Sequence, residues 1–216
     1  MREAIIEKVL QRKIVAIVRG VYGDDCVRLA EALAAGGIGL MEVTFDQSAA
    51  NAVELTGGAI RAVAAALGER MEVGAGTVTS VELVRAAAEA GAKFIVSPDV
   101  NEDVIRETVR LGMVSMPGAL TPTECMVAHR AGADFVKLFP AGELGTGYLK
   151  AIRSPLNHIR FLAVGGVGVG NLADFLKAGA LGAGIGGSLV SKDLIRAGRF
   201  DEITATAKAL VAAAQG

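Results

Sequence analysis

The sequence contains no tryptophan, and aromatic residues occupy only 4% of its 216 positions. It also lacks any apolar run near the ~20 residues that a membrane-spanning helix needs. The 22 lysines and arginines nearly balance the 23 aspartates and glutamates, and no basic stripe is present, so we expect neither a nucleic-acid nor a membrane partner. The N-terminal segment lacks the apolar core of a signal peptide, so we expect a cytoplasmic protein.

The chain is equally poor in cysteine and histidine. Cys26 and Cys125 lie far apart, each within a helical pattern, and fit neither a metal site nor a disulfide framework. His129 falls in a predicted helix and His158 beside a predicted strand, and neither has the spacing of a metal ligand. We therefore expect two reduced cysteines and no bound metal.

Small and apolar residues are abundant: the chain has 28 glycines, and 52% of its residues are hydrophobic. Short apolar segments alternate with amphipathic ones, which indicates a parallel sheet covered by helices. Eight such units predict a single α/β domain over residues 1–216, a (β/α)8 TIM barrel with an extra N-terminal helix, because the alternative open sheet rarely needs eight strands. The predicted strands are residues 14–19, 39–44, 72–76, 94–97, 114–116, 135–139, 160–164 and 182–185. The helices predicted to follow them are residues 24–35, 49–67, 80–90, 102–111, 121–131, 148–152, 171–178 and 202–213.

The predicted sixth strand carries a lysine, Lys137, in the middle of an apolar run. Two-residue alternation places Lys137 on the same strand face as Phe135 and Phe139. If this face lines a cavity, desolvation lowers the pKa of the lysine and frees a neutral amine that can form a Schiff base with a carbonyl. The alternative is a lysine near a strand end whose ammonium group reaches water along its aliphatic stem.

Glu42 is the second unusual residue, because a carboxylate within an apolar strand is costly unless it is paired. It shares a strand face with Leu40 and Thr44. Glu42 and Lys137 could form a structural ion pair across the barrel, or Glu42 could be a general acid–base beside a Schiff-base lysine. Perturbed charges cluster at functional sites, so two opposite charges in apolar strands favour the catalytic interpretation.

The carboxyl ends of the strands supply further candidates, because barrels of this kind place their active sites there. Arg19 ends the first strand and is a candidate anion binder, although such an arginine is as often a solvated rim residue. The glycine-rich turns after the seventh and eighth strands are suited to bind phosphate or carboxylate through backbone N–H groups. The candidates at the strand ends are Arg19, Thr77, Pro98, Gly165, Gly166, Gly187 and Ser188.

Seven short motifs, in chain order, resemble those of a known family. They are E-V-T at Glu42, G-A-G-T-V at residues 74–78, S-P at Ser97, M-P-G at Met116, V-K-L-F-P-A at residues 136–141, G-G-V at Gly165 and G-G-S at Gly186. Together they resemble the KHG/KDPG aldolases, which cleave 2-keto-4-hydroxy acids to pyruvate and an aldehyde. The substrates of that family include 4-hydroxy-2-oxoglutarate (KHG) and 2-keto-3-deoxy-6-phosphogluconate (KDPG).

The resemblance runs from about Lys13 to the last helix and carries several implications. It implies a (β/α)8 barrel, commonly a homotrimer, that acts on a small 2-keto acid without a metal or organic cofactor. Lys137 would be the Schiff-base lysine and Glu42 the general acid–base. Thr77 and Phe139 would border the pyruvate moiety. The phosphate end would be bound by Gly165, Gly166, Gly187 and Ser188.

Two positions depart from classical KDPG aldolases. Asp46 replaces an arginine that helps to hold the substrate carboxylate, so we expect Asp46 to turn away and backbone N–H groups near Gly76 and Thr77 to bind the carboxylate. Val164 replaces a threonine, which is more similar to aldolases acting on the galactonate epimer. Two other classes stay open: a phosphosugar-binding barrel that forms no imine, and a noncatalytic binding relative.

Overall fold

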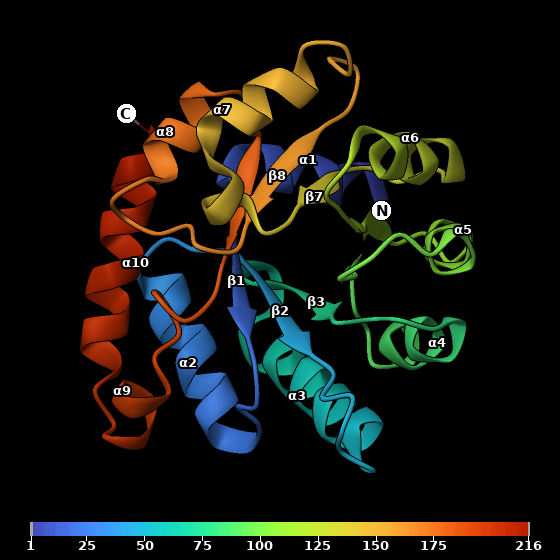
Figure 1. The fold of residues 1–216 in the computed structure, drawn as a ribbon. Coiled ribbons are helices and arrows are strands. Elements are labelled where there is room, and N and C mark those ends of the chain that lie inside the picture. Colours follow the sequence, from blue (N-terminus) through green and yellow to red (C-terminus); the bar gives the residue numbers. More distant parts are fainter. Residues whose placement is uncertain (1, 216) are drawn as a thin grey trace.

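A computed structural model describes residues 2–215, which form a ring of parallel strands surrounded by helices (Figure 1). This arrangement confirms the predicted (β/α)8 barrel with an extra N-terminal helix. The strands are β1 (Ile14–Val18), β2 (Leu40–Thr44), β3 (Glu72–Gly76), β4 (Phe94–Val96), β5 (Val114–Met116), β6 (Gly118–Ala119), β7 (Val136–Leu138), β8 (Phe161–Val164) and β9 (Gly182–Ile185). The helices are α1 (Arg2–Arg12), α2 (Gly23–Ala35), α3 (Ala52–Leu67), α4 (Val81–Glu89), α5 (Glu102–Arg110), α6 (Pro122–Ala131), α7 (Ala141–Arg153), α8 (Leu172–Lys177), α9 (Lys192–Arg196) and α10 (Phe200–Gln215), with a 3₁₀ turn at Gly68–Arg70.

The predicted fifth strand is interrupted at Pro117 and continues as a second short strand. β5 pairs with β4 on one side, whereas β6 pairs with β7 on the other. The backbone N–H of Lys137 in β7 donates to the Pro117 carbonyl at 2.9 Å. This bond lies at the interruption between β5 and β6, so β7 follows the chain across it. The observed order β5-β4-β3-β2-β1-β9-β8-β7-β6 therefore closes into a ring, because its two ends belong to one stretch of chain.

Alternation of side chains along the strands divides the apolar core into two parts. In β2, Met41 and Val43 point outward and pack beneath the helices, whereas Leu40 and Glu42 point into the barrel. The same alternation turns Lys137 of β7 inward. The strand faces predicted for the two charged residues are thus confirmed.

Helix α1 closes the end of the barrel at which the strands begin, and it lies behind them in Figure 1. Its buried side chains Ile5, Ile6 and Val9 belong to the same cluster as the first inward layer of the strands. Burial of each such side chain contributes ~1.5–3 kcal/mol to folding. That layer consists of Val15, Leu40, Phe94, Val114, Phe135 and Leu162.

Two helices differ from the sequence-based prediction. α7 begins at Ala141 rather than near residue 148, and its two helical parts meet at Gly145, whose φ of 75° lies in the left-handed region. α9 was not predicted, and it begins where the Ser191 side chain accepts a hydrogen bond from the Leu194 N–H. Within residues 2–215, no helix combines the length and the apolar character that a membrane crossing demands.

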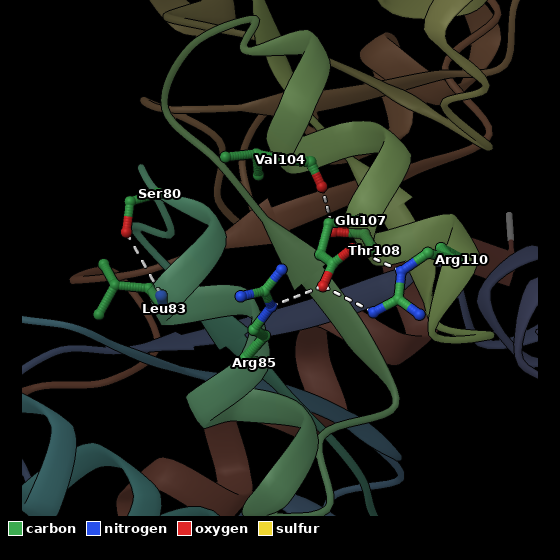
Figure 2. A network of polar contacts seen from close by, with 7 residues as sticks. All are labelled: Ser80, Leu83, Arg85, Val104, Glu107, Thr108 and Arg110. Atoms are coloured by element: carbon green, nitrogen blue, oxygen red, sulfur yellow. Dashed lines mark hydrogen bonds and ion pairs between the residues drawn. The ribbon is translucent and has the colours of Figure 1, made fainter.

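An ion-pair network centred on Glu107 joins α4 to α5 on the outside of the barrel (Figure 2). Arg110 donates from Nε to Glu107 at 2.6 Å, and Arg85 donates from Nε at 2.8 Å. These hydrogen bonds hold the pKa of Glu107 at about 2, below its ordinary value of 4.5. The network therefore stabilises the fold only while Glu107 is ionised.

We expect Glu107→Gln to lower Tm at neutral pH. A carboxylate whose pKa is lower in the folded state stabilises the fold above its unfolded pKa, here near 4.5, and loses that contribution as the pH falls towards 2. Thermal unfolding should therefore show a Tm gap between wild type and variant that narrows as the pH is lowered below 4.5. Glu102→Gln serves as a control, because exposed pairs such as Glu102–Arg106 contribute little. A gap that does not depend on pH would contradict this interpretation.

Candidate active site

A cavity of ≈ 730 Å³ opens at the carboxyl ends of the strands, where barrels of this kind place their active sites. The two charged residues of the apolar strands, Glu42 and Lys137, both line it. The other eight candidates from the sequence line it as well: Arg19, Thr77, Pro98, Phe139, Gly165, Gly166, Gly187 and Ser188. The structure thus brings all ten residues together, while their individual roles stay predictions.

Lys137 projects from the middle of β7 into this cavity. Its Nζ donates a hydrogen bond to the Ser97 carbonyl, 3.2 Å away, and lies 5.0 Å from the centre of the Phe139 ring. Burial lowers the pKa of Lys137 below its ordinary value of 10.5, and the negative charge of Glu42 opposes this shift only in part. The amine is therefore easier to deprotonate than a solvated lysine, as a nucleophile requires.

Glu42 lies in the middle of β2 with only 3% of its surface exposed. Burial raises the pKa of Glu42 from 4.5 to about 7, against the opposing positive charges of Lys137 and Arg19. The neighbouring strand leaves room for the carboxyl group only because residue 76 is glycine: a Cβ at Gly76 would lie 2.5 Å from Oε2. A carboxyl group with a pKa near neutrality can both donate and accept a proton.

The two charges do not form a structural ion pair. Within residues 2–215, Glu42 Oε2 is buried without a hydrogen-bond partner, and Lys137 Nζ donates to Ser97 instead. A structural pair would be in direct contact, because a buried charge without a partner destabilises the fold. The geometry therefore favours the catalytic interpretation of these two residues.

An apolar floor separates the two charges from the closed end of the barrel. A space of ≈ 10 Å³, about the size of one water molecule, lies between Glu42, Lys137 and this floor. The low polarity of these surroundings is the physical cause of both pKa shifts. The floor consists of Val15, Ile17, Val96, Met116, Leu162, Val164 and Gly184.

Two glycine-rich turns, one after β8 and one after β9, form another wall of the cavity. Gly165 has a φ of 86°, and a Cβ there would lie 3.0 Å from the Phe139 ring, so this position needs glycine. Ser188 of the second turn donates its hydroxyl to the Val167 carbonyl of the first at 3.1 Å. Backbone N–H groups in such turns can bind an anion.

Asn171 is a cavity residue that the sequence analysis did not single out. Its Nδ2 donates to the Gly166 carbonyl and its Oδ1 accepts from the Gly168 N–H, both at 2.9 Å. The side chain thereby fixes the turn after β8. The available signal was an asparagine at the start of a predicted helix, but this side chain makes no cap hydrogen bond and reaches back to the turn.

Asp46 is exposed and does not line the cavity. Its Oδ1 accepts hydrogen bonds from the Ser48 hydroxyl at 2.6 Å and from the Ser48 N–H at 3.0 Å, and both bonds lower the pKa of Asp46. The side chain thus turns towards its own loop, as predicted. Arg19, by contrast, lines the cavity and can interact with an anionic ligand.

The two cysteines and the two histidines of the chain lie outside this cavity. Among the described residues, no group of three or more histidine, cysteine, aspartate or glutamate side chains could hold a metal ion. The rings of His129 and His158 lie 4.9 Å apart, edge to face, beside a separate hollow. Cys26 and Cys125 are buried free thiols, and burial raises their pKa to about 12 and about 11.

Comparison with known proteins finds a family model and curated relatives that match most of this chain. The model of the KDPG and KHG aldolase family matches residues 5–206. A 2-dehydro-3-deoxy-6-phosphogalactonate aldolase from Escherichia coli (strain K12) is 37% identical over 89% of this chain and 89% of its own. A 2-dehydro-3-deoxy-phosphogluconate aldolase from Treponema pallidum (strain Nichols) is 36% identical over 93% of each chain.

The similarity extends to a solved structure with a covalently bound ligand. It is the KDPG aldolase from Legionella pneumophila with pyruvate captured at low pH as a covalent carbinolamine intermediate. The TM-score is 0.83 at 25% identity, over 95% of this chain and 97% of that one. With a family model that spans most of the sequence and relatives above one third identity, this chain belongs to the KDPG and KHG aldolase family.

Proposed function

We propose that this chain is a class I aldolase that cleaves a 2-keto-3-deoxy-6-phospho sugar acid to pyruvate and glyceraldehyde 3-phosphate. The observation that carries the proposal is a pair of opposite pKa shifts in one cavity: the pKa of Lys137 is lowered, and the pKa of Glu42 is raised to about 7. Environments that move two pKa values towards neutrality suit one group for nucleophilic attack and the other for proton transfer. Family membership supports the same reaction class.

In the proposed reaction, neutral Lys137 adds to the C2 ketone of the substrate. Glu42 transfers protons while the carbinolamine loses water and becomes an iminium. The iminium accepts the electrons of the C3–C4 bond as the C4 hydroxyl loses its proton, so the aldehyde departs and an enamine is left. Protonation at C3 and hydrolysis then release pyruvate and restore the amine. The iminium is the electron sink, so the proposal includes no metal or organic cofactor.

The two ends of the substrate would bind at different loops. The carboxylate would interact with backbone N–H groups near Gly76 and Thr77 and with Arg19, while Phe139 would border the pyruvate moiety and Pro98 the rim. Backbone N–H groups at glycine-rich turns are suited to the phosphate. These would come from Gly165, Gly166, Gly187 and Ser188, which line the same cavity.

Val164 bears on the choice between substrates that differ in configuration at C4. Its side chain lines the cavity and cannot hydrogen-bond a sugar hydroxyl, as a threonine could. The relatives named for the galactonate and gluconate substrates are about equally similar, at 37% and 36%, so overall identity does not decide between them. We expect loose or reversed discrimination, with KDPG, its galactonate epimer and KHG as candidate substrates.

The proposed enzyme is a cytoplasmic homotrimer with no nucleic-acid or membrane partner. Its net charge of -1 supports the absence of a nucleic-acid partner, and the resemblance to a commonly trimeric family supports the oligomer. A phosphosugar-binding barrel that forms no imine would share the glycine-rich turns. An inert Lys137 would distinguish that second possibility.

Covalent trapping tests the Schiff base directly. Borohydride added with pyruvate should reduce an imine and leave a stable adduct on Lys137, detected by mass spectrometry of peptides. Lys137→Arg should abolish both adduct and turnover, because arginine stays protonated and cannot act as the nucleophile. Lys150→Arg, an exposed position on α7, is the matched control and should behave as wild type. An active enzyme that stays unmodified would exclude the imine mechanism.

For Glu42→Gln we expect kcat to fall by ~10²–10⁴-fold, the usual contribution of a general acid–base. The fold should not weaken. A carboxyl group whose pKa is raised on folding stabilises the protein below its unfolded pKa and loses that contribution as the pH rises through about 7. The Tm of Glu42→Gln should therefore equal or exceed that of wild type above pH 7. Exposed Glu89→Gln, at the end of α4, is the control. A variant with near-native kcat would favour a structural role.

Val164→Thr tests the discrimination at C4. The new hydroxyl can hydrogen-bond a sugar hydroxyl, so the ratio of kcat/KM for KDPG to kcat/KM for the galactonate epimer should rise about 2- to 10-fold, the range of one net hydrogen bond. Steady-state kinetics with both epimers gives this ratio. The preference for phosphorylated over unphosphorylated substrate should not change, because the glycine-rich turns are untouched. An unchanged epimer ratio would show that residue 164 does not determine the preference between the two C4 epimers.

A further inference from the structure

The side chain of Gln47 bridges two loops at the rim of the cavity. Its Nε2 donates to the Thr77 carbonyl at 2.9 Å, and its Oε1 accepts from the Thr79 hydroxyl at 3.1 Å. Gln47 belongs to the loop between β2 and α3, whereas the two threonines belong to the loop between β3 and α4. One exposed amide therefore uses both its donor and its acceptor to tie these loops together.

The backbone of Thr77 has a strained conformation that a hydrogen bond from Gln47 can help to maintain. Its φ of 56° lies in the left-handed region, which a β-branched residue rarely adopts. The backbone is also held on each side: the Gly76 carbonyl accepts from the Phe45 N–H at 2.9 Å, and the Val78 N–H donates to the Val96 carbonyl at 3.2 Å. The Gln47 contact adds a hydrogen bond at the strained residue itself.

The strained turn also sets the direction of the Thr77 N–H. Thr77 lines the cavity together with Glu42. This N–H therefore belongs to a residue at which the proposed function places the substrate carboxylate. Its direction depends on a backbone conformation that the bond from Gln47 helps to maintain.

Asp46 places Gln47 for this contact. Asp46 accepts two hydrogen bonds from Ser48, and its own carbonyl accepts from the Ala49 N–H at 3.2 Å. These bonds make a turn around Gln47. The aspartate that stands in place of the arginine of classical relatives therefore stabilises the turn that carries Gln47.

We propose that Gln47 is a positioning residue that, together with Thr79, presents the Thr77 N–H to the substrate carboxylate. The inference rests on the proposed function. It concerns only the pyruvate end of the substrate, because other side chains, Asn171 and Ser188, tie the glycine-rich turns. A chain without an arginine at position 46 can thus bind the carboxylate through an oriented backbone donor.

Gln47→Glu is the sharpest test, because it keeps the size of the side chain and replaces the NH₂ donor with an oxygen that repels the Thr77 carbonyl. The pyruvate concentration for half-maximal borohydride adduct should rise about 2- to 10-fold, the range of one net hydrogen bond, and KM should rise with it more than kcat falls. The inhibition constant of inorganic phosphate should not change. Gln11→Glu adds the same charge at an exposed position of α1 and should behave as wild type.

Variants of Thr79 provide an independent measurement on the same contact. Thr79→Val should raise the half-maximal pyruvate concentration, though by less than Gln47→Glu, whereas Thr79→Ser keeps the hydroxyl and should match wild type. If wild type forms the adduct and Gln47→Glu forms it at the same pyruvate concentration, the positioning role is overturned while the aldolase stands. An equal shift in phosphate inhibition would also overturn it, because the effect would not be confined to the pyruvate end. A wild type that forms no adduct would overturn the Schiff-base function and this role with it.

Discussion

The opposite pKa shifts in this barrel depend on holding two opposite charges apart in surroundings that offer them little water. If Glu42 and Lys137 touched, each would stabilise the ionised form of the other, so the pKa of the carboxyl group would fall and that of the amine would rise. Their separation, with Lys137 bonded to Ser97 and Glu42 unpaired against Gly76, leaves burial as the dominant effect on both. Each group is thereby moved towards the pKa range in which it can exchange a proton at neutral pH.

The strands and the loops of the barrel hold different parts of the proposed active site. β2 and β7 carry Glu42 and Lys137, the two groups proposed to react, in the middle of a hydrogen-bonded ladder, so their positions are set by the whole barrel. The loops hold the residues proposed to bind the ends of the substrate, and side-chain bonds to backbone carbonyls fix those loops at Asn171, Ser188 and Gln47. Donors that are oriented before the ligand arrives need no reordering when it binds.

Local patterns were sufficient to predict the barrel and its two inward charges, because side-chain alternation needs only neighbouring residues. They were insufficient for Gln47 and Asn171, whose side chains bond to groups in turns that no periodicity describes. The start of α7 at Ala141 was missed because the segment that follows is rich in glycine, a weak helix former. The interruption at Pro117 was read as a strand end, since only the pairing of β7 shows that the strand continues.

Because α1 closes one end of the barrel, ligands can enter and leave the cavity only at the other end. In the proposed reaction, the substrate enters and both products leave at the carboxyl ends of the strands, where the cavity opens. Pyruvate would be attached to Lys137 on the inner side, with the aldehyde between it and the entrance. The aldehyde must then leave first, and the water that hydrolyses the imine enters through the space it vacates. In the condensation direction, pyruvate must form the enamine on Lys137 before the aldehyde is added. The helix that closes the far end leaves both molecules the same entrance.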